Sequence, residues 1–467
     1  MPRRKYPLIE NLEIIGLAAE GKAIGKYNGK VVFVPYAAPH DVVNVQITNS
    51  RSGYMEGVVT DFIHQSEIRV KPFCSHFGVC GGCKWQHLPY PEQLAYKQQQ
   101  VFDQLTRIGK FTELNILPIL GSENEQYYRN KLEFTFSNKR WRTREEMNSE
   151  ILLSSDALGF HIPGLFDKVL DVDTCYLQPE PSNTLRRTVK EYAVKQGLTF
   201  FDIKAQSGFL RTMIVRNSIS SGEVMLIMVF GEDKEEERIK LLQYLQEKFP
   251  AITSLQYVIN TKGNDTINDL EVVCFHGKSY IEESMDGIVF RISPKSFFQT
   301  NTLQAQALYR IVRDFATLQG EETLYDLYTG TGTIALYLAA GAKKAVGIEY
   351  IPEAIEDAKK NAARNNIHNA VFYAGDMKDL LTPDFFAANG QPDVIVLDPP
   401  RAGIHPAVAE NVLKSGAGRL VYVSCNPATQ ARDMALLAAD YRIAKVQPVD
   451  MFPNTHHVEN IILAEKI

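Results

Sequence analysis

The chain has few cysteines, no long apolar run and no low-complexity linker, and each shortage excludes a class of protein. Six cysteines in 467 residues cannot form a disulfide-stapled scaffold, so clustered cysteines indicate metal binding or chemistry in a reducing compartment. No window approaches 18 consecutive apolar residues, and the basic N-terminal segment is not followed by the apolar core of a secretory signal. We therefore expect a cytoplasmic protein with no membrane partner.

Composition otherwise matches a soluble globular protein, with 45% hydrophobic and 22% charged residues, which excludes a disordered or collagen-like chain. The length suits two or three domains. A net charge of −5, taken alone, argues against a polyanion ligand. However, residues 1–144 contain 19 Lys and Arg against 13 Asp and Glu, and the remainder is acidic. The first third is therefore the predicted polyanion contact.

Within that third, residues 127–144 interleave six basic residues and five aromatic residues with a single acid. This composition suits neutralisation of phosphates combined with stacking on bases, and predicts that Arg129, Lys131, Arg140 and Arg142 contribute to RNA affinity. The alternative is an amphipathic edge strand with a solvated basic face.

Four regions follow one another along the chain. The first 65 residues are short β-rich runs broken by glycine, which predict a small barrel. Residues 91–109 carry apolar residues at helical spacing, and residues 127–290 mix strands with helices. From residue 323 strand and helix alternate, which predicts a doubly wound α/β sheet with ligand sites at the carboxyl ends of its strands.

The first motif at such a strand end is DLYTGTGT, in which Gly330 and Gly332 allow the backbone to approach a ligand. Glu349 ends the next strand, 19 residues beyond Gly330, where a carboxylate accepts from ribose hydroxyls. Because only two glycines are present, we expect an adenosine cofactor without a pyrophosphate, such as S-adenosylmethionine. Asp376 then faces the adenine amino group. Alternatively, each acid caps the helix that follows it.

Three further strand ends carry reactive or rigid groups. Asp398 precedes two prolines in LDPPRAG, which fix a rigid turn with an acidic side chain. Such a turn is able to hold a planar base, and the alternative is a turn without a binding role. Cys425 in VSCNP lies at a helix start that favours a thiolate, the alternative being a small buried apolar residue. Glu459 opens an apolar strand, where a buried carboxylate without a task is costly.

These residues suit one reaction. Carbon-5 of uracil is a poor nucleophile, but addition of a thiolate to carbon-6 creates an enolate that attacks an activated methyl group. A base then removes the carbon-5 proton so that the thiol leaves. Cys425 and Glu459 fit these two roles, and Asp398 fits contact with the base edge or with the amine of the methyl donor.

A cysteine cluster precedes the first long helix. Cys74, Cys80 and Cys83 lie within ten residues, and Cys175 follows far downstream. Four thiolates suit zinc or an iron–sulfur cluster, and spacing alone does not choose between them. A metal-free arrangement is the remaining alternative. Cys274 is interpreted as a core residue.

The chain resembles the S-adenosylmethionine-dependent RNA uracil-5-methyltransferases over nearly its whole length and with the motifs in the same order. The motifs are CSHFGVCGGCKWQHLPYPEQLAYK, YYRNKLEF, FFQTN, DLYTGTGTIAL, LDPPRAG, SCNPATQARD and HVEN. It is most similar to the branch that acts on large-subunit (23S) ribosomal RNA, which has an N-terminal TRAM domain of the OB type and a four-cysteine iron–sulfur cluster. Branches without these two features, such as the tRNA methyltransferase, fit less well.

The resemblance implies roles for individual residues. It makes Cys425 the nucleophile and Glu459 the base. The implied cofactor contacts, with Gly330 from the glycine loop, are Gln299, Tyr328, Thr333, Glu349, Asp376 and Asp398. The implied ligands of a [4Fe-4S] cluster are Cys74, Cys80, Cys83 and Cys175.

The resemblance also implies a multidomain fold. Residues 1–67 form an OB-type β-barrel, the TRAM domain. Residues 68–91 and 126–290 form an α+β iron–sulfur domain, and residues 92–125 and 291–467 form a Rossmann-like methyltransferase domain. We expect a monomer.

The main hypothesis is methylation of carbon-5 of a uridine in 23S ribosomal RNA. The alternatives are the same reaction on tRNA and a non-catalytic RNA-binding iron–sulfur protein, although binding alone requires neither Cys425 nor Glu459. A DNA or RNA amino-group methyltransferase is a third alternative, because Asp-Pro-Pro-Arg resembles the Asp-Pro-Pro-Tyr type of site. That chemistry needs no cysteine, and Arg401 replaces the aromatic stacking partner.

Overall fold

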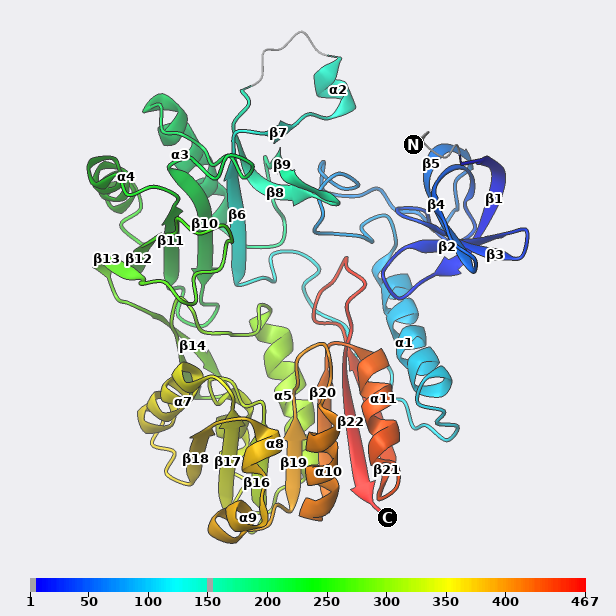
Figure 1. The fold of residues 1–467 in the computed structure, drawn as a ribbon, viewed down its shortest axis with the longest axis vertical. Coiled ribbons are helices and arrows are strands. Elements are labelled where there is room, and N and C mark those ends of the chain that lie inside the picture. Colours follow the sequence, from blue (N-terminus) through cyan, green and yellow to red (C-terminus); the bar gives the residue numbers. More distant parts are fainter. Residues whose placement is uncertain (1–5, 149–153) are drawn as a thin grey trace.

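Short strands at the start of the chain close into a barrel, in the order β1-β2-β3-β5-β4 (Figure 1). The computed structural model describes residues 6–148 and 154–467. The barrel strands are β1 (Leu8–Leu17), β2 (Ala23–Tyr27), β3 (Lys30–Val34), β4 (Val42–Ser50) and β5 (Tyr54–His64). Alternate residues such as Val43, Val45 and Ile47 point into the barrel and form its own small core. The predicted barrel is confirmed.

A loop that contains three of the cysteines leads from the barrel into α1 (Tyr90–Arg107). This helix buries Val101 and Leu105 against the C-terminal part of the chain, where it packs on α11 (Pro427–Leu437) and β21 (Tyr441–Val449). The segment after α1 continues this contact through two isolated bridges to β21 and its end, from Ile116 and Leu120. The predicted helix is therefore confirmed, and it lies on a sheet that is distant in sequence.

The middle of the chain forms an eight-stranded sheet in the order β13-β12-β11-β10-β6-β8-β9-β7. Its strands are β6 (Lys131–Ser137), β7 (Arg140–Trp141), β8 (Ala157–Ile162), β9 (Leu165–Asp171), β10 (Leu210–Asn217), β11 (Val224–Phe230), β12 (Ser254–Ile259) and β13 (Val273–Gly277). The associated helices are α2 (Arg144–Met147), α3 (Ser182–Lys195) and α4 (Glu235–Lys248). One face packs under α3 and α4 through residues such as Phe134 and Leu241.

Two interpretations are wrong for this sheet. β6 lies between β10 and β8, so the edge-strand alternative does not describe it; within residues 127–144, the sheet edge is formed by the short β7. Cys274 is exposed rather than buried in a core, because β13 is the outermost strand at the other side of the sheet.

The C-terminal part forms a seven-stranded sheet in the order β18-β17-β16-β19-β20-β22-β21. Its other strands are β16 (Thr323–Leu327), β17 (Lys344–Glu349), β18 (Ala370–Ala374), β19 (Val394–Leu397), β20 (Arg419–Ser424) and β22 (Glu459–Lys466). The predicted start of this region at residue 323 coincides with β16. β16 to β20 pair in parallel, whereas β22 runs antiparallel to β20 and β21. This is the predicted doubly wound sheet, with one reversed strand near its edge.

Helices cover both faces of the seven-stranded sheet. The helices of this region, besides α11, are α5 (Thr302–Ala316), α6 (Thr333–Ala339), α7 (Pro352–Arg364), α8 (Met377–Leu380), α9 (Pro383–Asn389) and α10 (Pro406–Ser415). One core contains α5, α6 and α7, and the other contains α1, α10 and α11. A hairpin of β14 (Ile281–Met285) and β15 (Ile288–Ile292) joins the two large sheets along the chain.

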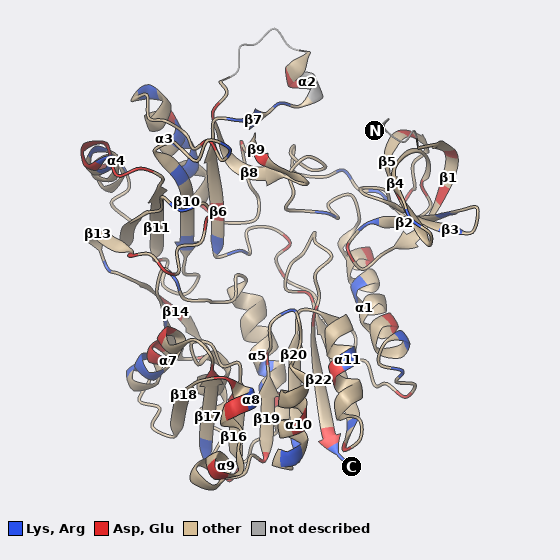
Figure 2. Cartoon of the chain, in the orientation of Figure 1, with Lys and Arg blue, Asp and Glu red and all other residues tan. Residues whose placement is uncertain are grey.

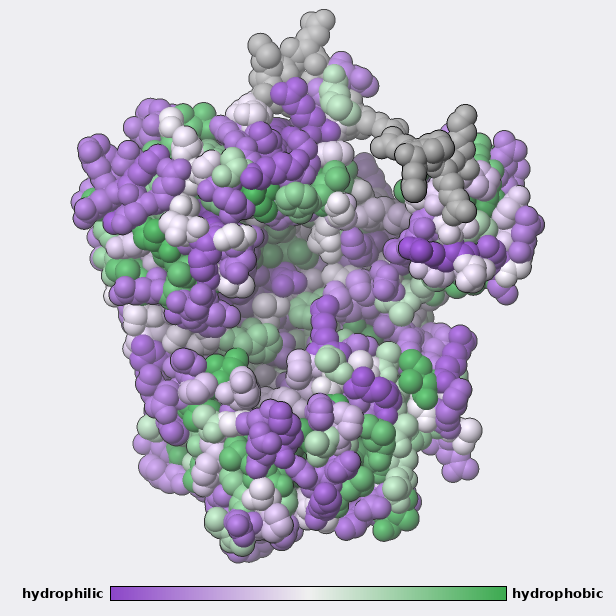
Figure 3. Space-filling view, viewed as in Figure 1, coloured by the Kyte–Doolittle hydropathy of each residue, from purple (hydrophilic) through white to green (hydrophobic). Residues whose placement is uncertain are grey.

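The carboxyl ends of the parallel strands point toward the eight-stranded sheet and the barrel (Figure 1). Figure 3 shows the surface hollowed between the two large sheets at this level. The strand ends that carry the predicted site residues therefore face an open cleft. None of the helices in the described part of the chain is both long and apolar enough to span a membrane.

A buried ion pair connects α1 to the loop before β22. The Lys97 ammonium lies 2.6 Å from the Asp450 carboxylate, and both side chains are fully buried. Lys97 also donates to the carbonyl of Phe452 at 3.1 Å, and the Tyr90 hydroxyl donates to the other Asp450 oxygen at 2.9 Å. This hydrogen-bonded pair holds the loop that ends at Glu459.

We expect Lys97→Met to lower the free energy of unfolding by about 3 to 5 kcal/mol, because it leaves the buried Asp450 charge unpaired. Urea denaturation measures the change. The matched control is Arg107→Met on the same helix, whose partner Asp103 forms an exposed pair at 3.3 Å, and which is expected to cost at most about 1 kcal/mol. Equal effects of the two substitutions would contradict the role of the buried pair.

Candidate active site

The glycine loop after β16 borders open space. Tyr328, Gly330 and Gly332 all have left-handed φ values, of 68°, 56° and 80°. A Cβ built on Gly330 meets nothing within 4 Å, whereas one on Gly332 would lie 2.9 Å from the Cβ of Ala358 in α7. The loop therefore packs against α7 at Gly332 and exposes its backbone to the cleft at Gly330, as a ligand-binding loop requires.

A carboxylate without a full set of partners lies beneath this loop. One oxygen of Asp326 accepts from the Thr329 hydroxyl at 2.5 Å and from the Ala335 amide at 2.9 Å. Its other oxygen is buried and has no hydrogen-bond partner. Burial raises the pKa of Asp326 to about 7. An unpaired buried oxygen costs free energy, so this position favours a bound donor or cation.

Asp398 and Glu459 add two more carboxyl groups. Burial, together with the Asp326 charge, raises the pKa of Asp398 to about 7. Burial, together with the Asp398 charge, raises the pKa of Glu459 to about 8, while Arg401 opposes this shift. The loop after β19 and the start of β22 thus bring two carboxyl groups from distant segments into one low-dielectric region.

The raised pKa of Glu459 makes stability pH-dependent. Between about pH 5 and 8 the folded chain holds a proton at Glu459 that the unfolded chain has released, because the ordinary value is 4.5. The free energy of unfolding therefore falls as pH rises through this range. Wild-type protein should lose more free energy of unfolding between pH 5.5 and 8.5 than Glu459→Gln does. A single pKa shift of this size makes the difference about 3 kcal/mol. Urea denaturation at both pH values tests it, and parallel curves would contradict it.

Cys425 lies between β20 and α11, in a loop tied to the Asp398 loop. The Asn426 side chain caps α11 by accepting from the Ala428 amide at 3.2 Å, and it donates to the Arg401 carbonyl at 3.1 Å. Burial and the Glu459 charge raise the pKa of Cys425 to about 11, although the Arg401 guanidinium donates to the thiol and lowers it. Burial thus opposes the thiolate that the helix start was predicted to favour.

Asp433 fixes the turn that follows Asp398. One of its oxygens accepts from the Tyr422 hydroxyl at 2.6 Å and from the Ile404 amide at 2.9 Å. Gly403 has φ +80°, and a Cβ there would lie 2.2 Å from that oxygen. Glycine is thus required where the turn passes over Asp433.

Glu349 and Asp376 lie at the ends of β17 and β18. Glu349 accepts from the Gly330 amide at 3.1 Å, which joins the glycine loop to the next strand. Asp376 caps α8 by accepting from the Lys378 amide at 3.1 Å, and this contact lowers its pKa. The predicted cap at Asp376 is therefore present, and its contact with a cofactor stays a prediction. Burial raises the pKa of Tyr328 to about 12, and the charges of Asp376 and Glu349 add to this shift.

Tyr309 in α5 is a site residue that sequence reasoning missed. Its side chain is 3% exposed, and its hydroxyl hydrogen-bonds with Thr333. Burial and the charges of Asp398, Asp326 and Glu459 raise its pKa. Its position on the apolar face of a helix is typical of a core residue, so no local signal marked it. It connects Thr333 to the carboxyl groups.

Gln299 lies in the loop before α5. Its carbonyl accepts from the Asn130 side chain at 2.8 Å, which attaches this loop to the start of β6. Gln299 is therefore placed at the boundary between the two large sheets, and its contact with a cofactor stays a prediction.

The four predicted metal ligands lie in one region. Burial, with the charges of the other three thiols, raises the pKa of Cys83 to about 12. Cys175 is buried, and its amide donates to the Asn183 side chain at 2.8 Å. Across residues 6–148 and 154–467, however, no group of three or more His, Cys, Asp or Glu side chains is arranged to hold a metal ion. The structure thus does not show the predicted metal site.

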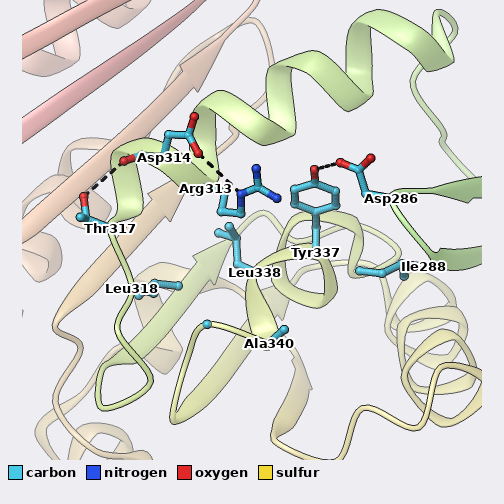
Figure 4. A pocket seen from close by; sticks show the side chains of 10 residues that line it. Asp286, Ile288, Arg313, Asp314, Thr317, Leu318, Tyr337, Leu338 and Ala340 are labelled. Carbon is cyan, nitrogen blue, oxygen red and sulfur yellow. Dashed lines mark hydrogen bonds and ion pairs between the residues drawn. The ribbon is translucent and has the colours of Figure 1, made fainter.

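A cavity of about 610 Å³ lies elsewhere, between α5, α6 and the β14–β15 hairpin (Figure 4). Asp286, Arg313 and Tyr337 contribute polar groups to its wall, and the Tyr337 hydroxyl donates to Asp286. None of the predicted site residues lines it. The cavity is therefore separate from the strand-end site.

Comparison with known proteins gives two family matches and several full-length relatives. Residues 213–467 match the family described as tRNA (Uracil-5-)-methyltransferase, and residues 9–60 match the TRAM domain. A protein of Bacteroides thetaiotaomicron named as an RNA methyltransferase is 55% identical, over 96% of this chain and 100% of the relative. One of Porphyromonas gingivalis with the same name is 53% identical, over 97% of this chain and 99% of the relative.

A solved structure is similar over the whole chain. The tRNA (uracil-54, C5)-methyltransferase of Pyrococcus abyssi, determined in complex with S-adenosyl-L-homocysteine, has a TM-score of 0.76 and 29% sequence identity. The match covers 98% of this chain and 100% of that one.

Proposed function

Since this chain belongs to the RNA uracil-5-methyltransferase family, we propose that it methylates carbon-5 of a uridine in large-subunit (23S) ribosomal RNA. S-adenosylmethionine-dependent RNA uracil-5-methyltransferase activity follows from the family. The ribosomal substrate is supported by the resemblance to the branch that combines a TRAM domain with four cysteines. A tRNA substrate is the second candidate, favoured by the similarity to the Pyrococcus abyssi tRNA enzyme.

Purified protein with labelled S-adenosylmethionine distinguishes the two substrates. We expect 5-methyluridine to form in unmodified 23S ribosomal RNA, with tRNA transcripts as the parallel substrate. Mapping of 5-methyluridine in both RNAs of a deletion strain gives the matching result in cells. Methylation confined to tRNA would establish the second candidate instead.

The observation that carries the proposal is the grouping of Asp326, Asp398 and Glu459 beside an open glycine loop. Burial makes the charged form of these carboxyl groups costly, and a cation beside them offsets that cost; a sulfonium methyl donor is cationic. The unpartnered Asp326 oxygen and the open space at Gly330 fit such a ligand. When bound, S-adenosylmethionine supplies the methyl group that carbon-5 receives. The residues proposed to hold it are Gln299, Tyr328, Gly330, Thr333, Glu349, Asp376 and Asp398.

We propose that the reaction proceeds through a covalent bond between Cys425 and uracil. The Cys425 thiolate adds to carbon-6, and the electron pair moves to the oxygen on carbon-4, which makes carbon-5 nucleophilic. The Arg401 guanidinium stabilises the thiolate by donating to it. After carbon-5 has gained the methyl group, Glu459 takes its proton. The carbon–sulfur bond then breaks, which restores the double bond and releases Cys425 as a thiolate.

We also propose that Cys74, Cys80, Cys83 and Cys175 hold a [4Fe-4S] cluster. The mutual proximity of the four thiols supports it, since each of the other three raises the pKa of Cys83. Purification without oxygen followed by iron, sulfide and zinc analysis tests the proposal. Stoichiometric zinc without sulfide would identify a zinc site instead of a cluster. Absence of iron, sulfide and zinc would mean that the four thiols bind no metal.

A further inference from the structure

Three cations gather where the eight-stranded sheet meets the loops of the active site. Lys131 in β6 pairs directly with Arg216 in β10, so both side chains point from the same face of the sheet. Arg129 lies two residues before Lys131. Figure 2 shows basic residues at the ends of β6 and β10 nearest the seven-stranded sheet. The predicted basic segment is thus extended by a residue from a strand distant in sequence.

This face of the sheet turns toward the site. Ile214, two residues before Arg216, packs in the core that contains Phe298 and α5, whereas Val215 packs in the opposite core under α3 and α4. The Arg216 guanidinium donates to the Ser296 carbonyl at 2.9 Å, three residues before Gln299. The Arg129 guanidinium stacks over Phe452, in the loop that leads to Glu459, at 5.4 Å from the ring centroid. The cations therefore lie between two loops of the active site.

Their charges are poorly compensated by the described protein groups. Arg216 is 6% exposed, and its Nε is buried without a hydrogen-bond partner, as is the Nε of Arg129. Glu133 approaches Lys131 to 2.6 Å, but its side chain is 53% exposed. Burial and the charges of Arg216 and Arg129 lower the pKa of Lys131. Like charges directly opposite one another in a sheet destabilise it, so this arrangement favours an anionic ligand.

Arg140, by contrast, does not belong to this group. It pairs with Glu146 at 2.5 Å and with Asp171 at 3.1 Å, in the part of the sheet formed by β7 and β9. Its Nε is also buried without a partner, but the two carboxylates compensate its charge inside the protein, whereas Arg129 and Arg216 form no ion pair in the described residues. The sequence-based prediction that Arg140 contributes to RNA affinity is therefore not supported by its position.

We propose that Arg129, Lys131 and Arg216 form a subsite for one phosphodiester group of the RNA, adjacent to the target uridine. The inference rests on the proposed function, which supplies the RNA. A phosphodiester would supply the negative charge that Arg129 and Arg216 do not meet in the described residues, where Arg216 donates only to the carbonyls of Ser293 and Ser296. It would also be a second anionic partner for Lys131, beside Glu133. The subsite would anchor the backbone beside the base that is turned into the cleft.

The test is RNA binding by Lys131→Gln at several salt concentrations, with a fragment of 23S ribosomal RNA that wild-type protein binds. We expect about tenfold weaker binding and a salt slope smaller by about one, because one phosphate contact is lost. Lys139→Gln is the matched control, since Lys139 follows the far end of β6 and pairs with Asp202 at 3.2 Å. It should leave both quantities unchanged. Arg216→Lys, which keeps the charge, should retain most of the affinity.

A second measurement identifies the ligand. The affinities of wild-type protein and of Lys131→Gln are measured for RNAs in which a single phosphate beside the target is replaced by a neutral methylphosphonate. At the contacted phosphate, the methylphosphonate should weaken binding by wild-type protein about tenfold. It should not weaken binding by Lys131→Gln any further. Additive losses at every position, or unchanged binding by Lys131→Gln, would overturn the subsite. Methylation of the same RNA is followed separately, so binding without methylation would count against the proposed function alone.

Discussion

Replacing Cys425 with alanine is expected to lower the rate of methylation at least about 10⁴-fold while leaving affinity for S-adenosylmethionine within about twofold of wild type. The thiol is the only group in the proposed reaction that activates carbon-5, so no slower covalent route remains. The cofactor contacts are proposed for other residues, and removal of one sulfur at the edge of the cleft leaves them in place. Single-turnover methylation and equilibrium binding of labelled cofactor measure the two quantities.

Cys274→Ala is the matched control for this substitution. Cys274 is exposed on the outermost strand of the eight-stranded sheet, so its loss should leave methylation unchanged. If Cys425→Ala kept a rate within tenfold of wild type, the covalent route would be wrong and direct attack by the base would have to be considered.

Glu459→Gln is expected to convert the enzyme into a stable covalent complex with methylated RNA. The amide cannot remove the carbon-5 proton, so addition and methyl transfer occur but the carbon–sulfur bond does not break. The buried site favours this isosteric replacement, because burial already favours the neutral form of Glu459 and raises its pKa to about 8. A denaturing gel with labelled RNA and S-adenosylmethionine should show a slowly migrating band that persists for hours.

The band must depend on the thiol, so the double variant with Cys425→Ala should not form it. Glu465→Gln serves as the second control, because Glu465 lies on the same strand and pairs with Arg442 at its exposed end. Release of free methylated RNA by Glu459→Gln at the wild-type rate would assign proton removal to another group. If neither an adduct nor methylation were seen at any time, Glu459 would act before methyl transfer.

Much of the site was predictable because its residues follow strands that the sequence marks clearly. Buried parallel strands consist of continuous apolar runs, and Glu349, Asp398 and Cys425 lie at or beside their carboxyl ends. In a doubly wound sheet these ends share one edge, so local pattern was enough to predict that the residues face a common cleft. The glycine loop and the paired prolines are local features of the same kind.

Other features depend on contacts between distant segments, which no local pattern encodes. Lys97 meets Asp450 across 353 positions, and its place in a helix predicts only a solvated cation. Tyr309 is a core residue by its spacing, yet its hydroxyl reaches Thr333. Arg140 belongs to a basic segment, yet it forms ion pairs inside the protein. In each case the partner is chosen by packing.

The sequence by itself determined the order of the elements, the barrel and the seven-stranded sheet, and it predicted a thiol and a carboxyl group as nucleophile and base. These depend on backbone preferences and apolar periodicity, which act over short stretches of chain. Only the tertiary structure decided the protonation of those groups and the position of Arg216 opposite Lys131. A pKa is set by burial and by every nearby charge, so the same cysteine that a helix start would activate is held as a thiol, with a pKa of about 11, once Glu459 and the protein interior surround it.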